Sequence, residues 1–398
     1  MKLKPQPNHV RSRRWITLAL FCACLPAIAH GQKPAANRTA LVSPALPTYL
    51  PQPVAQPLDR GYVLPDGSVR IVGFDDMNGM VARWNAEFTR THPGIRFTPI
   101  LKGNGTAIPA ITYDMTLFAP EGGGATLLEL LPYEKIYGSK KDPVAALIIR
   151  VAHGSLTPGA KMSPLAIVTN KSNSLPDITQ EQVARIFSTG AGTGDITSWQ
   201  QLGHADVSDG KAIHPVGLYW DAYQRPEDEY MGEYMMYRHF GPFPGHVFSP
   251  NYRQYLTYRE VAAAVAQDRS AIGILPLNQV TRDLRVVPMP ATDGKGMTTG
   301  SAEDIIADRY PYPRDLYLYI RREPGTPLDP LVVEYVKLVL SRQGQEAVAR
   351  DDKGYLPLNV NDVQDGLDRL EAAKTWAPRS KQGPKLNFPF PSPEPLGK

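Results

Sequence analysis

Cysteine is almost absent from this sequence of 398 residues, and both copies, Cys22 and Cys24, lie near the N-terminus. The rest of the chain has no thiol, which excludes a disulfide, a cysteine-ligated metal and a cysteine nucleophile there. The sequence also lacks a Gly-x-Ser-x-Gly motif and a His-Glu-x-x-His motif, two common signatures of hydrolases. We therefore predict no catalytic residue, and an enzyme is the least supported class of function.

Long hydrophobic runs and runs of like charge are missing too. The longest apolar stretch, Trp15 to Ala27, is too short to span a membrane. It follows five basic residues and ends in Ala27-Ile28-Ala29, which is the pattern of a secretory signal cleaved after Ala29. Loss of these five charges changes the formal net charge from +4 to −1, so nucleic acid is not an expected partner. We expect a periplasmic or secreted protein without membrane insertion after cleavage.

Proline is concentrated near both ends of the chain. After the signal at 1–29, residues 30–67 carry repeated prolines and few periodic apolar residues, which is typical of an extended linker. Residues 361–398 form a matching proline-rich tail, and packing of either segment along the surface is the alternative. The chain is 42% hydrophobic, which is enough for one large or two medium cores between these ends.

Between these ends, short apolar runs alternate with helical patterns. The β-branched run Val69–Val72 predicts a strand that ends at Gly73, and apolar residues then recur at helical spacing up to Phe88. Further strands are predicted at 95–101, 117–119, 144–151, 165–169, 213–218, 271–275 and 316–320. Further helices are predicted at 127–137, 179–187, 227–237 and 259–267, and from 326 onwards. This alternation indicates a parallel or mixed sheet.

Two of the turns between a strand and a helix are rich in glycine. Their residues are Gly73, Phe74, Asp75 and Asp76 in the first turn, and Gly103, Asn104, Gly105 and Thr106 in the second. The helix after such a turn points unpaired N–H groups into the space where open α/β folds place ligands. The alternatives are that Asp75 or Asp76 merely caps its helix, and that Thr106 does so in the second turn. Because both turns follow strands, we expect them to converge in one lobe.

The segment 219–258 is unusually rich in aromatic residues and methionine. Tyr230, Tyr234 and Tyr237 fall on one helical face, which favours the core of a second lobe. An aromatic cleft wall or a docking surface is the alternative. His239 and His246 have no nearby acids at ligand spacing, so no metal site is predicted.

Four stretches have the order and motifs of a known family. They are Gly73 to Phe88 with His92-Pro93-Gly94, Leu165 to Phe187 with Trp199, Tyr310-Pro311 with Arg314 and 316–319, and 339–345 with 354–358. In these residues the chain resembles the periplasmic phosphate-binding proteins of ABC transporters and the wider phosphate-binding-like domain family. The resemblance implies an α/β, type II periplasmic-binding-protein fold, with two lobes joined by two crossing strands. We expect 68–162 and 284–360 in lobe I and 163–283 in lobe II.

The ligand residues of that family carry over only in part. Its first loop has serine or threonine after the glycine, where this chain has Phe74 and two aspartates. Its clamping arginine and Ser-Gly-Thr are replaced by a stretch with Tyr219 and Trp220, where Arg225 is either a substitute clamp or a solvated surface residue. Two carboxylates at the mouth of a helix would repel a phosphate dianion. We therefore expect weakened selectivity for phosphate.

The resemblance implies a small ligand, phosphate or another solute, without a cofactor, and an ABC permease as partner. The predicted ligand contacts are Phe74, Asp75, Asp76, Gly103, Asn104, Gly105, Thr106, Tyr219, Trp220 and Arg225. We expect Trp220 or Tyr223 to close over Asn104. The predicted function is extracytoplasmic solute binding for ABC-type uptake or sensing. A secreted scaffold or adhesin that reuses the fold with a degenerate site is the alternative.

Overall fold

The computed structural model describes residues 38–57, 59–138, 146–190, 193–204, 211–221, 224–228, 231–240, 247–323 and 326–374. The predicted signal with its cut at Ala29, Tyr223, His246 and the end of the predicted tail lie outside these residues. The described part holds two lobes, each with its own hydrophobic core. None of its helices is long and apolar enough to cross a membrane.

Lobe I is built around five strands. They are β1 (Val69–Gly73), β2 (Phe97–Leu101), β3 (Ala119–Gly122), β4 (Leu147–Ala152) and β14 (Leu316–Ile320). β1 and β2 pair in parallel, and β14 lies antiparallel between β3 and β4. The Phe74 N–H donates to the Pro120 carbonyl at 2.9 Å, which places the end of β1 beside β3. The spatial order is therefore β2-β1-β3-β14-β4.

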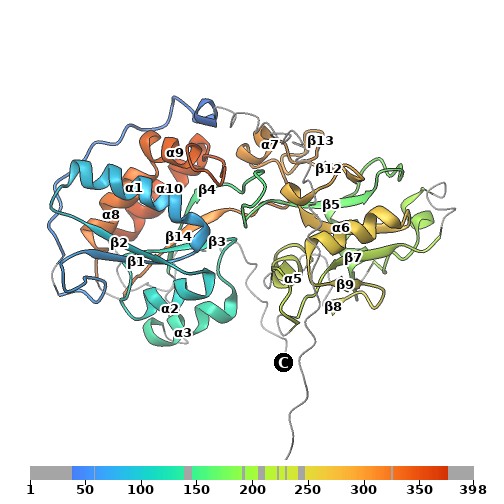
Figure 1. Cartoon of the computed structure of the whole chain (residues 1–398), viewed down its shortest axis with the longest axis horizontal. Helices are drawn as coiled ribbons and strands as arrows, with labels where there is room; N and C mark the ends of the chain where they lie inside the picture. The colour runs from blue at the N-terminus through green and yellow to red at the C-terminus, as the bar shows by residue number, and fades with distance from the viewer. Residues whose placement is uncertain are drawn as a thin grey trace, which may run out of the picture. The chain divides into compact units, whose positions relative to one another are not determined.

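Helices cover both faces of these strands (Figure 1). They are α1 (Asn78–Thr91), α2 (Ala107–Thr112), α3 (Leu127–Tyr137), α8 (Pro330–Val339), α9 (Arg342–Ala349) and α10 (Val360–Lys374). Figure 1 shows α1, α8, α9 and α10 on one face and α2 with α3 on the other. Trp84 of α1 is fully buried, and its indole N–H donates to the Gly344 carbonyl at 3.0 Å. This contact fixes α1 against α9.

The segment before β1 packs against lobe I rather than extending as a linker. It begins with a 3₁₀ helix, Arg38–Leu41, and buries Val42, Leu46 and Tyr62 in the lobe I core. At the other end, α10 occupies the start of the predicted tail and buries Leu370. Both observations match the alternative of surface packing, because enough apolar side chains lie between the prolines to reach the core.

Lobe II surrounds a sheet with the order β11-β5-β10-β7-β9. Its strands are β5 (Leu165–Asn170), β6 (Ser188–Thr189), β7 (His214–Leu218), β8 (Val247–Phe248), β9 (Arg253–Tyr255), β10 (Ala271–Pro276), β11 (Leu284–Val286), β12 (Met289–Pro290) and β13 (Met297–Thr298). Its helices are α4 (Gln180–Phe187), α5 (Met231–Glu233), α6 (Tyr258–Gln267) and α7 (Ala302–Ile306). Thr179 and Gln182 form a capping box at the start of α4.

The return to lobe I comes later than position 284. β11 pairs antiparallel with β5, so the chain continues within lobe II, and Met289, Ile305 and Tyr312 are buried in the core of that lobe. One crossing segment follows β4, and the other precedes β14. They meet where the Leu165 N–H donates to the Tyr312 carbonyl at 3.1 Å. Two α/β lobes joined by two crossing segments form the predicted type II periplasmic-binding-protein fold.

Five charged residues meet beside these crossing segments. The Arg150 guanidinium contacts Asp308 at 2.7 Å, Asp315 at 3.1 Å and, more closely, Asp362. His153 is fully buried, and its ring nitrogens lie 3.2 Å from Asp315 and 3.1 Å from Asp362. Burial lowers the pKa of His153, but the bonds to the two carboxylates outweigh burial and raise the pKa to about 9. The imidazole is therefore charged at neutral pH.

Several predicted elements are displaced. β3 begins at Ala119 instead of 117, and the helix predicted at 227–237 is a short α5 followed by a π-helical stretch, Tyr234–Phe240. α8 begins at Pro330, because the carboxylate of Asp329 accepts the Leu331 N–H at 2.9 Å and caps the helix there. α8 buries Leu331, Val332, Tyr335 and Val339.

Candidate functional site

The two glycine turns lie at adjacent strand ends, as predicted. Gly73 and Leu101 are partners in the last position of the β1–β2 register. The Gly73 carbonyl accepts the N–H of Lys102 at 2.8 Å and of Gly103 at 3.1 Å, which joins the two turns directly. Gly103 has a φ of 132°, a conformation that a residue with a side chain rarely adopts.

Asn104 ties the second turn to the end of β3. Its amide nitrogen donates to the Gly122 carbonyl at 2.8 Å, and its amide oxygen accepts the Gly122 N–H at 3.0 Å. Thr106 does not cap α2 through its side chain, because its hydroxyl donates to the Gly103 carbonyl at 2.8 Å. The ends of β1, β2 and β3 therefore form one hydrogen-bonded unit.

Phe74 supports this unit from inside the lobe. Its side chain is buried and packs against Gly122, where an added Cβ would lie only 2.6 Å from the ring. Phe74 can therefore contribute only its backbone to the site, and the hydrogen bond to the Pro120 carbonyl holds that backbone in place.

The aspartates of the first turn are paired with lysines. Asp75 lies 2.6 Å from the ammonium of Lys161, and Asp76 lies 2.8 Å from that of Lys353. Buried Asp76 also accepts the Tyr355 hydroxyl at 2.6 Å and the Lys161 N–H at 2.9 Å. Neither aspartate caps α1, so that alternative is wrong. The expected repulsion of an anion is also corrected, because two lysine charges compensate two carboxylates.

Glu121 is a residue that the sequence reasoning missed. It is almost fully buried at the end of β3, and its Oε2 has no hydrogen-bond partner among the described residues. Burial, with a smaller contribution from nearby Glu129, raises the pKa of Glu121 well above its ordinary value. Since Gly122 faces Phe74, strand alternation points Glu121 to the opposite face of β3. The sequence signal that could have identified Glu121 is its place directly before three glycines at the end of a strand.

The lobe II candidates lie at the end of β7. The Tyr219 N–H donates to the Tyr255 carbonyl at 3.0 Å. Trp220 is 54% exposed and stacks on Phe248 with 6.4 Å between ring centroids. Arg225 is exposed and has a φ of 52°. Among the described residues, no hydrogen bond or ring contact joins Trp220 to the glycine turns, so their predicted approach stays a prediction.

Arg314, which belongs to the family-like motif before β14, does not replace the missing clamp. Its side chain is only 2% exposed and lies 2.6 Å from Asp228. Asp228 also accepts the Tyr258 hydroxyl at 3.0 Å, and the guanidinium lies 5.6 Å from the centre of the Tyr234 ring. Because of these contacts, the Arg314 side chain is buried and paired within the protein.

The charged cluster beside the crossing segments is the arrangement closest to a metal site. The ligand atoms of His153, Asp308 and Asp315 all lie within 4.8 Å of one another. Arg150 already bonds both carboxylates, and both ring nitrogens of His153 face carboxylates. A cation would have to displace Arg150, so the geometry favours an ion-pair network over a metal centre.

Residues 161–343 match the model of the PBP superfamily domain. The chain is therefore similar to the PBP superfamily class of proteins over lobe II, the crossing segments, β14 and α8. Within that class the chain resembles the phosphate-binding proteins of ABC transporters. It is 27% identical to the phosphate-binding protein PstS of Pseudomonas aeruginosa, over 89% of this chain and 99% of that protein, in each of two strains.

Solved structures give matches with lower identity. PstS from Borrelia burgdorferi is 16% identical, with a TM-score of 0.48, over 73% of this chain and 99% of that chain. An ABC-type phosphate transport receptor from Vibrio cholerae is 15% identical, with a TM-score of 0.46, over the same shares of the two chains.

Proposed function

We propose that this protein is an extracytoplasmic solute-binding protein that holds a small ligand over the two glycine turns and serves an ABC permease. The observation that carries the proposal is the hydrogen-bonded unit formed by the ends of β1, β2 and β3. In α/β folds, ligands usually bind where such turns converge at the carboxyl ends of strands. The likeness to PstS over nearly the whole length of both chains supports the same class.

The charge of the site supports a small oxyanion or a polar solute as ligand. Lys161 and Lys353 compensate Asp75 and Asp76, so the first turn presents backbone N–H groups without a net negative charge. The end of β7 offers the exposed ring of Trp220 in place of the guanidinium and hydroxyls of the family. Because a bidentate charge partner is missing there, we expect phosphate to bind more weakly than about micromolar, or roughly −8 kcal/mol.

The test is calorimetric titration of the mature protein with phosphate, together with mass spectrometry of ligand released from the natively purified protein. Asn104→Ala removes both bonds to Gly122 and should abolish binding of whichever ligand is found. Arg369→Ala, on the exposed face of α10, is the matched control and should bind normally. Normal binding by Asn104→Ala would place the ligand elsewhere. A protein without any ligand would favour the scaffold.

The predicted location of the protein outside the cytoplasm belongs to the same proposal. We propose that the signal is removed after Ala29 and that the protein acts in the periplasm or medium. N-terminal sequencing of the protein released by osmotic shock should begin at His30. A chain that keeps Met1 would contradict this predicted location.

A further inference from the structure

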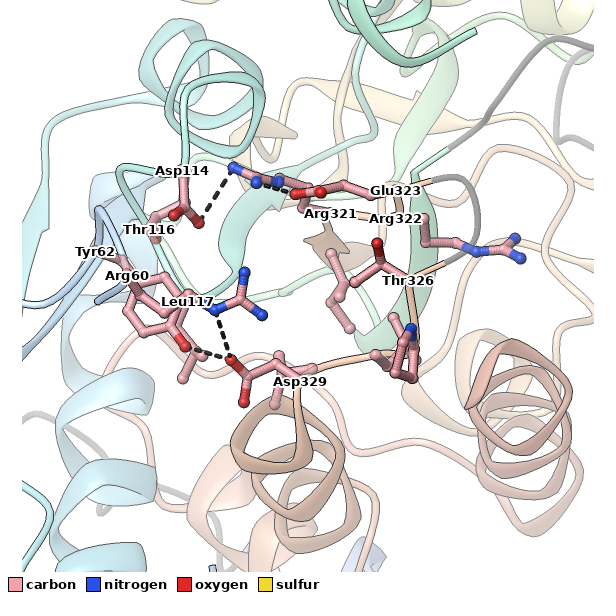
Figure 2. Close-up of a pocket in the computed structure, with 14 residues that line it drawn as sticks. Arg60, Tyr62, Asp114, Thr116, Leu117, Arg321, Arg322, Glu323, Thr326 and Asp329 are labelled. Carbon is pink, nitrogen blue, oxygen red and sulfur yellow. Dashed lines mark hydrogen bonds and ion pairs between the residues drawn. The ribbon is translucent and has the colours of Figure 1, made fainter. Parts of the chain in front are cut away.

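A cavity lies in lobe I (Figure 2), and the pairing of β3 with β14 places it away from the glycine turns. β3 and β14 are antiparallel, with Ala119 opposite Tyr319 and Gly122 opposite Leu316. The glycine turns meet Gly122, whereas the cavity is lined by residues that precede β3 and residues that follow Ile320. It is therefore separate from the proposed ligand site.

The segment before β1 supplies one wall of this cavity, with Arg60 and Tyr62. The Gly61 N–H donates to the Asp114 carboxylate at 2.8 Å, and the Gly61 carbonyl accepts a guanidinium N–H of Arg70 at 2.8 Å. An added Cβ at Gly61 would lie 2.6 Å from the Asp114 carbonyl oxygen, so this close approach requires glycine. The backbone that carries Arg60 is therefore held firmly.

Most charged groups around the cavity already have partners. Arg321 lies 3.1 Å from Asp114 and contacts Glu323 more closely. Asp329 accepts the Tyr62 hydroxyl and the N–H that begins α8. Four of the six charged side chains that line the cavity make these bonds, and Arg60 is not among them.

Arg60 points its guanidinium into the cavity (Figure 2). Its Nε lies 3.7 Å from the nearest Asp329 oxygen, which is an ion pair but too long for a hydrogen bond. Among the described residues, its side-chain N–H groups have no hydrogen-bond acceptor. A guanidinium presents parallel N–H groups that match the two oxygens of a carboxylate.

We propose that this cavity binds a small monocarboxylate, with Arg60 as its bidentate partner. The cavity has a volume of about 40 Å³. At about 10–15 Å³ for each water, that space suits a carboxylate with one or two further atoms. Three arginines and three acids line the cavity, so their formal charges balance. A single added negative charge is compatible with this balance, whereas a divalent anion is repelled by Asp329 and Glu323.

The test is titration of the mature full-length protein with ¹³C-labelled acetate at fixed ionic strength, followed by NMR line width. Wild-type protein should bind acetate saturably, and sulfate should compete at least tenfold less well. Arg60→Gln should lower the affinity at least tenfold, and Arg369→Gln should leave it unchanged. Arg60→Lys keeps the charge but loses the two-pronged geometry, so its affinity should fall between the two.

Three results would overturn the proposal. They are no saturable acetate binding by the wild type, equal affinity in Arg60→Gln, and tighter binding of sulfate than of acetate. If Arg60→Gln does not reach the wild-type melting temperature, Arg60→Lys alone decides, and wild-type affinity in that variant would contradict the bidentate contact.

Discussion

Raising the pH from 6 to 9 should weaken the fold through one buried side chain, His153. Its imidazolium faces Asp315 and Asp362, with Arg150 and Asp308 completing the cluster. Burial opposes the charge of Asp315, but Arg150 and His153 outweigh burial and lower its pKa to about 2, and Asp362 is shifted in the same direction. The pKa of Arg150 is raised. His153, whose pKa is about 9, changes its charge within this range.

The magnitude follows from the shift. The pKa of His153 is about 9 in the folded protein, against an ordinary value of 6.5. At about 1.4 kcal/mol for each unit, the charged imidazole contributes about 3 kcal/mol to the free energy of unfolding. Because the folded pKa is raised, this contribution is fully present below about pH 6.5 and is lost as the pH rises through 9. The fold should therefore be more stable at pH 6 than at pH 9.

Urea unfolding followed by tryptophan fluorescence can measure this, because the chain has five tryptophans. The free energy of unfolding is compared at pH 6 and pH 9 for the wild type and for His153→Gln. The difference between the two proteins should shrink by about 3 kcal/mol over this range. His204→Gln, at a partly exposed position, is the control and should show a constant difference. A difference between wild type and His153→Gln that is equal at both pH values would refute the reasoning.

Three further substitutions test the surroundings of the candidate site residues. Asp76→Asn removes the charge of a buried carboxylate that pairs with the exposed Lys353 and accepts the Tyr355 hydroxyl, and it should cost about 2–4 kcal/mol in the free energy of unfolding by urea. Asp75→Asn, at a more exposed carboxylate, should cost under about 1 kcal/mol. Equal costs would show that burial of Asp76 does not matter. Gly217→Ala would place a Cβ 2.1 Å from the Tyr252 hydroxyl and should lower the free energy of unfolding by about 1–3 kcal/mol. A neutral result in thermal unfolding would show that Tyr252 can move aside.

The fold was largely predictable because its signals are local. A strand ended by Gly73 and a helix with Trp84 and Phe88 inward can be read from spacing alone, and the capping box at Thr179 marks the start of α4. The start of α8 was misjudged because two prolines, Pro327 and Pro330, both fit the first position of a helix. Only the cap from Asp329 distinguishes them.

The candidate site was less predictable because its partners are remote in sequence. Asp76 pairs with Lys353 and Tyr355, and the tyrosine is 279 positions away in the sequence. No local pattern could therefore reveal that the charge of Asp76 is compensated. The same holds for Arg60, whose surroundings come from three separate parts of the chain. Glu121 differs, since its place before Gly122 was visible, but its burial was not.

The attachment of the first described residues to lobe I bears on the order in which the protein can fold. The Arg38 guanidinium donates to the Ala349 carbonyl, which is 311 positions away, so lobe I is assembled from both ends of the chain. The core of lobe II, by contrast, comes mainly from the continuous stretch 165–312. Contacts between distant residues carry a larger entropic cost of loop closure. During synthesis from the N-terminus, the chain can therefore complete lobe II first. Lobe I can be completed only after α9 and α10 have been made.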